Sequence, residues 1–131
     1  MKINHLGIAV KNIESSVVLY KESLGWKETT KLIYDPVQKV NVLFMSDSHG
    51  SKFELLEPVG DDSPISKMLT RRIGLYHICY EVQDIKSKIK ELTKKGFFLI
   101  SDPVEAVAFD GRVISFLINS DNLIIELLEQ Q

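Results

Sequence analysis

The sequence predicts an α+β fold made of two βαβββ modules within a single domain. Two observations carry this prediction: segments of the first half recur 72 residues later, and both halves show the same succession of strand-like and helix-like patterns. The composition supports a compact fold, because 44% of the 131 residues are hydrophobic and only 7 glycines and 4 prolines interrupt the chain.

The repeat is clearest at the two ends of each half. Residues 5–13 (HLGIAVKNI) align with residues 77–85 (HICYEVQDI), which keep the histidine, a valine and the final isoleucine in register. Residues 53–57 (FELLE) and 125–129 (IELLE) are identical at four of five positions. A two-copy period of this length is typical of a duplicated α/β unit rather than of a solenoid.

The first half begins with a strand over residues 2–10, where Leu6, Ile8 and Val10 share one face. Asn12 is the expected N-cap of a helix that ends at Gly25. The apolar face of this helix comprises Ile13, Val17, Tyr20 and Leu24. Three apolar segments follow and are predicted as strands, at residues 27–34, 39–46 and 51–57.

The second half repeats this plan. Its first strand has an alternating face made of Tyr76, Ile78, Tyr80 and Val82. Asp84 is the expected N-cap, and Gly96 is the expected end of the helix. The apolar face of this second helix comprises Ile85, Ile89 and Leu92. Strands are predicted at residues 97–101, 112–118 and 122–128.

A short connecting helix joins the two halves. Ser63 is a suitable N-cap and Pro64 suits the first helical position, so the helix is expected to run to about Arg71. The predicted organisation is therefore one domain over residues 1–131, made of repeats 1–57 and 74–131 with the linker helix in residues 58–73.

Charge and hydropathy exclude several classes of partner. Sixteen Lys and Arg residues against 18 Asp and Glu residues give a net charge of −2, which disfavours a nucleic-acid partner. No apolar run is long enough to span a bilayer, and the N-terminus lacks an apolar targeting segment. The single cysteine, Cys79, fits a reducing compartment. We therefore expect a soluble, cytoplasmic protein that binds neither nucleic acid nor a membrane.

Two histidines and two glutamates recur with equal spacing. His5 precedes Glu54 by 49 residues, and His77 precedes Glu126 by the same number. A histidine that occurs alone on a strand is ordinarily a hydrogen-bonded core residue. A glutamate that occurs alone on a strand is ordinarily a solvated residue of an edge strand. If a pseudo-twofold axis relates the halves, however, the four side chains converge. Two imidazoles and two carboxylates suit one divalent ion, which could be zinc, nickel, cobalt or manganese.

The chain resembles the vicinal oxygen chelate superfamily, whose glyoxalase-like fold pairs βαβββ modules. The segments that carry the resemblance are HLGIAV (5–10), FELLEP (53–58), DSPI (62–65), YHICYEV (76–82) and IELL (125–128), and they are most similar to the methylmalonyl-CoA epimerase branch. The resemblance implies a cupped mixed sheet around a metal site and a homodimer.

The resemblance also implies roles for particular residues. His5, His77 and Glu126 occupy metal-ligand positions of the epimerase branch, whereas Glu54 stands where those epimerases carry glutamine and where bacterial-type glyoxalase I carries glutamate. A further catalytic glutamate of the epimerases aligns with Val42, and no acidic residue occurs from position 36 to position 46. This departure leaves the specific substrate open.

These features predict a metal-dependent enzyme that transfers a proton at a carbon next to a carbonyl group, with Glu54 and Glu126 as the catalytic carboxylates. The first interpretation is epimerisation of a methylmalonyl-CoA-like acyl thioester. The alternatives are glyoxalase I (lactoylglutathione lyase)-type isomerisation of a hemithioacetal and a non-catalytic small-molecule binding protein of the same fold. Metal-dependent oxygenases of the superfamily are disfavoured, since Glu54 would occupy a coordination position that oxygen needs.

Overall fold

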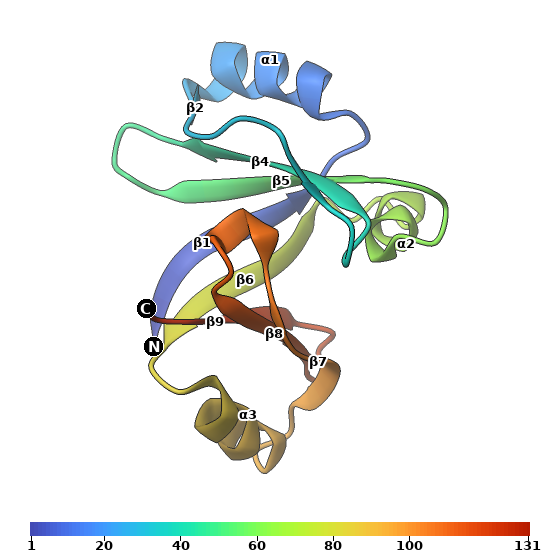
Figure 1. The fold of residues 1–131 in the computed structure, drawn as a ribbon. Helices are drawn as coiled ribbons and strands as arrows, with labels where there is room; N and C mark the ends of the chain where they lie inside the picture. Colours follow the sequence, from blue (N-terminus) through green and yellow to red (C-terminus); the bar gives the residue numbers. More distant parts are fainter. The chain divides into compact units, whose positions relative to one another are not determined.

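A computed structural model describes residues 1–131 and divides the chain into two compact units. The first unit comprises His5–Tyr76, and the second comprises His77–Gln131 together with Met1–Asn4. Each unit carries a mixed sheet and one longer helix (Figure 1). The structure therefore confirms the predicted α+β fold with βαβββ modules.

The elements follow the predicted order. The strands are β1 (Lys2–Ala9), β2 (Lys27–Glu28), β3 (Ile33–Asp35), β4 (Val40–Ser46), β5 (Lys52–Pro58), β6 (Leu75–Val82), β7 (Phe98–Glu105), β8 (Val113–Ile118) and β9 (Ile124–Glu129). The α-helices are α1 (Ile13–Leu24), α2 (Pro64–Thr70) and α3 (Ile85–Thr93), and Val107–Phe109 form a 3₁₀ turn. No helix is long and apolar enough to cross a membrane.

In the first unit the strand order is β2-β4-β5-β1, and β3 pairs with β4 at the edge. Strands β1 and β5 run parallel, whereas β4 runs antiparallel to β5. Helix α1 covers one face of β4 and β5 (Figure 1). The core between them comprises Val10, Ile13, Val17, Leu43, Met45 and Leu55. The side chains on the opposite face of the same strands therefore do not take part in the core beneath α1.

The second unit repeats this arrangement with the strand order β6-β9-β8-β7. Strands β6 and β9 are parallel, and β8 is antiparallel to β9. Helix α3 packs on one sheet face, where the core comprises Val82, Ile85, Leu117, Ile125 and Leu127. Asn4 belongs to this unit, and its side-chain amide donates to Glu81 Oε1 at 2.7 Å.

The predicted N-caps and the end of α1 are confirmed, whereas α3 ends at Thr93 with Lys94 as its C-cap, before the expected Gly96. Asn12 accepts from the backbone N–H of Ser15 at 2.9 Å, and Asp84 accepts from that of Ser87 at 3.0 Å. Gly25 ends α1 in the left-handed conformation at φ 70°, which favours glycine. Since these caps satisfy backbone groups that the helix itself leaves unpaired, they fix where each helix begins and ends.

A second cap repeats at the offset of 72. Glu57, the penultimate residue of β5, accepts from the backbone N–H of Ile13 at 3.3 Å. Glu129, the last residue of β9, accepts from that of Ile85 at 3.0 Å. Both carboxylates thus lie at helix N-termini, where the helix dipole favours negative charge. These glutamates tie each long helix to the parallel strand of its own unit.

Two strand predictions were inaccurate. The segment 27–34, predicted as one strand, forms two short strands that both pair with β4. The chain leaves the ladder between them because the Thr30 hydroxyl, instead of a backbone carbonyl, accepts from the N–H of Phe44. Strand β7 extends beyond the predicted 97–101 to Glu105 and contains register shifts. As the last strand of its sheet, β7 tolerates Pro103.

Candidate metal centre

In the first unit, parallel pairing brings His5 to Glu54. Gly7 lies directly opposite Glu54 in the β1–β5 ladder, and His5 lies two positions before Gly7 on the same strand face. Glycine carries no side chain that could separate Glu54 from the imidazole. His5 Nε2 lies 3.4 Å from Glu54 Oε1, and both side chains are buried.

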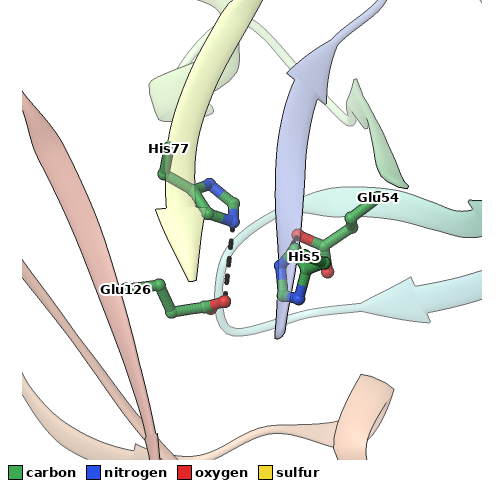
Figure 2. A group of neighbouring side chains, drawn as sticks. All are labelled: His5, Glu54, His77 and Glu126. Atoms are coloured by element: carbon green, nitrogen blue, oxygen red, sulfur yellow. Dashed lines mark ion pairs between the residues drawn. The ribbon is translucent and has the colours of Figure 1, made fainter. Parts of the chain in front are cut away.

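The second unit builds the same pair with the same register. Cys79 lies opposite Glu126 in the β6–β9 ladder, and His77 lies two positions before Cys79. His77 Nε2 is 3.5 Å from Glu126 Oε1, and Figure 2 shows the imidazole and the carboxylate turned toward each other. Both side chains are buried. The small side chain of Cys79 stands where the first unit has glycine.

The two pairs supply two imidazoles and two carboxylates, all of them buried. A buried carboxylate is unfavourable by several kcal/mol unless a cation or hydrogen bonds compensate it. Two ligand atoms that bind one ion at about 2.1 Å and at a tetrahedral angle lie about 3.4 Å apart. The nitrogen–oxygen separations of 3.4 and 3.5 Å therefore fit two ligands of a common ion.

Position 42, where the resembled epimerases carry a further catalytic glutamate, holds a buried valine in the structure. Val42 is buried on β4 and pairs with Leu56 of β5. The nearest preceding acid, Asp35, is also buried, but it accepts from the backbone N–H groups of Val37 and Gln38 at 2.9 and 3.1 Å. Asp35 therefore stabilises the turn before β4.

Two phenylalanines lie beside the pairs and are not among the predicted site residues. Phe44 contacts His5, and Phe116 contacts His77. Both are phenylalanines separated by the repeat offset of 72, and that recurrence is the signal that could have identified them.

Comparisons with known proteins agree with this arrangement. Residues 4–116 match the glyoxalase/bleomycin resistance protein/dioxygenase superfamily. The human mitochondrial methylmalonyl-CoA epimerase is 33% identical over 130 residues, which are 96% of this chain and 72% of the relative. The ethylmalonyl-CoA/methylmalonyl-CoA epimerase of Cereibacter sphaeroides is 32% identical over 118 residues, which are 88% of this chain and 87% of the relative.

A solved structure of Streptomyces coelicolor methylmalonyl-CoA epimerase in complex with 2-nitronate-propionyl-CoA has the same fold. It matches with a TM-score of 0.84 and 25% identity, over 99% of this chain and 97% of that one. The likeness covers both βαβββ modules.

Proposed function

Because the chain belongs to the glyoxalase/bleomycin resistance protein/dioxygenase superfamily, we propose that it is a divalent-metal-dependent epimerase acting on a methylmalonyl-CoA-like acyl thioester. Several relatives that match most of the chain are epimerases of methylmalonyl-CoA, which supports this substrate class. The observation that carries the proposal is the buried His–Glu pair, which both units repeat in the same register. By the family resemblance, the enzyme acts as a homodimer.

The proposed ligands of one divalent ion are His5, Glu54, His77 and Glu126. Imidazole and carboxylate donors suit zinc, nickel, cobalt or manganese. The equal spacing of the two pairs in the sequence and their ligand-like separations within each unit support a shared ion. Since all four side chains are buried, few water molecules would compete for it.

A divalent ion would supply a Lewis acid that polarises the substrate carbonyl and makes the adjacent C–H bond more acidic. The chain itself supplies the bases. One carboxylate, from Glu54 or Glu126, accepts the proton from the substrate carbon, and the other returns a proton to the opposite face. The carbon skeleton is unchanged, so one turnover interconverts the two stereoisomers and exchanges the protonation states of the carboxylates. In this proposal Glu54 serves as the second base that Val42 cannot provide.

A second candidate is glyoxalase I-type isomerisation of a hemithioacetal. One observation favours it: position 54 holds a glutamate, as in bacterial-type glyoxalase I, rather than the glutamine of the resembled epimerases. That reaction moves a proton between neighbouring carbons and can use a single base. A non-catalytic binding protein of the same fold is the remaining alternative.

Metal content tests the ligand assignment. Protein purified without chelator should hold or take up about one equivalent of a divalent ion. The His77→Ala variant should lose the ion and all activity, whereas His49→Ala, which alters an exposed turn histidine, should retain both. Metal content below about 0.3 equivalent without uptake on titration would overturn the proposal.

Deuterium incorporation separates the two reactions. In D₂O, the metal-loaded protein should introduce deuterium at the carbon beside the thioester carbonyl of methylmalonyl-CoA. Incorporation into the product of a hemithioacetal, and not into the thioester, would replace the epimerase with the second candidate. Exchange with neither substrate type, the ion still bound, would exclude both reactions and leave the binding protein.

A further inference from the structure

Each His–Glu pair is accompanied by a phenylalanine ring. The rings of His5 and Phe44 are nearly perpendicular, at 87°, with centroids 5.6 Å apart. The rings of His77 and Phe116 meet at 79° with centroids 5.3 Å apart. Phe44 and Phe116 are related by the same offset of 72 residues as the histidines, so the duplicated unit is a triad of imidazole, carboxylate and phenyl ring.

The sheet register shows why the ring belongs to the pair. Phe44 lies directly opposite Glu54 in the antiparallel β4–β5 ladder, and Phe116 lies directly opposite Glu126 in the β8–β9 ladder. Directly opposed residues project from the same sheet face. Each phenyl ring therefore shares a face with the carboxylate and contacts the imidazole of its own unit.

Packing of the helices does not account for these rings. The core beneath α1 contains Leu43 and Met45, the two neighbours of Phe44, but not Phe44 itself. The core beneath α3 contains Leu117, next to Phe116, but not Phe116. Both phenylalanines are nevertheless buried, at 8% and 6% exposure. They are therefore buried on the opposite sheet face, which carries the His–Glu pairs.

We propose that Phe44 and Phe116 are positioning residues for the metal centre, which fix the orientation of the His5 and His77 imidazoles before an ion binds. The inference rests on the metal-binding function proposed above. A perpendicular ring contact restricts rotation of the imidazole about its terminal torsion, which is otherwise broad.

Cobalt binding tests the proposal, because the visible spectrum of Co²⁺ reports ligand geometry independently of catalysis. Phe44→Leu should weaken Co²⁺ binding by about 10- to 100-fold and change the visible spectrum. Phe44→Tyr keeps the ring and should restore affinity to within about threefold of wild type. Phe116→Leu provides the equivalent test in the second unit, should Phe44→Leu fail to fold.

The matched control is Phe53→Leu, on the other face of β5. Phe53 stacks on Trp26 with centroids 3.8 Å apart, so its loss should lower thermal stability and leave Co²⁺ affinity and spectrum unchanged. Wild-type affinity and spectrum in folded Phe44→Leu or Phe116→Leu would overturn the positioning role while the metal function stands. Failure of the wild-type protein to bind any divalent ion would overturn the metal function and this inference together.

Discussion

Replacing Glu54 with glutamine tests whether the two carboxylates act as a pair of bases. The amide has the size of the carboxylate and keeps an oxygen ligand, and the site is buried, so the substituted side chain should remain near His5. The expected result is a protein that retains its divalent ion with one of its two bases removed. The variant therefore separates proton transfer from metal binding.

The expected loss of kcat follows from the usual effect of one general base and from the similar His–Glu pairs of the two units. Loss of one general base ordinarily lowers kcat by about 10²- to 10⁴-fold, which corresponds to about 2.7 to 5.5 kcal/mol of barrier. The carboxylates of Glu54 and Glu126 lie at almost equal distances from their histidines, 3.4 and 3.5 Å. We therefore expect Glu54→Gln and Glu126→Gln to lose similar activity, within about tenfold of each other.

The assay is epimerisation of methylmalonyl-CoA followed by deuterium exchange, with metal content measured on the same samples. Glu57→Gln is the control, because Glu57 lies on the same strand but caps α1, and its kcat should stay near wild type. A one-base isomerase would lose little with Glu54→Gln and nearly all activity with Glu126→Gln. Near-wild-type turnover in both glutamine variants, with the ion bound, would refute proton transfer by either carboxylate.

Three further predictions concern stability. Leu127→Ala should lower the free energy of unfolding in urea by about 2 to 5 kcal/mol, since Leu127 is fully buried, whereas Leu123→Ala at an exposed site should change it by less than about 0.5 kcal/mol. Glu129→Ala should lower the free energy of unfolding by about 1 to 2 kcal/mol, because the backbone N–H of Ile85, the first residue of α3, loses its acceptor. Thermal unfolding measures this effect, and an unchanged Tm would contradict the capping role. The hydrogen bond from the Ser87 backbone N–H holds the pKa of Asp84 below the ordinary value of an aspartate. The cap therefore stabilises the protein fully at pH values above that ordinary pKa and loses its effect as pH falls through the lower pKa of the folded state. Asp84→Asn should make stability less dependent on pH in this acid range, and urea midpoints that change identically from pH 5 to 2 in both proteins would exclude the effect.

The sequence was most informative where structure depends on neighbouring residues. The caps at Asn12, Ser63 and Asp84 were predicted correctly, since a cap acts on N–H groups two or three residues away. The segment 27–34 was predicted incorrectly as one strand, because the break in its pairing depends on contacts between Thr30 and the distant Phe44. The shared metal ion stays a prediction, supported by the repeat of both His–Glu pairs.

The sequence by itself determined the duplication, most of the succession of helices and strands, and the four candidate ligands, because periodicity, capping and repetition can be recognised along the chain. Only the tertiary structure decided the sheet registers, which place Glu54 opposite Gly7 on one side and opposite Phe44 on the other. The physical reason is that register depends on hydrogen bonds and side-chain packing between strands far apart in sequence, and local preferences of the backbone do not encode it.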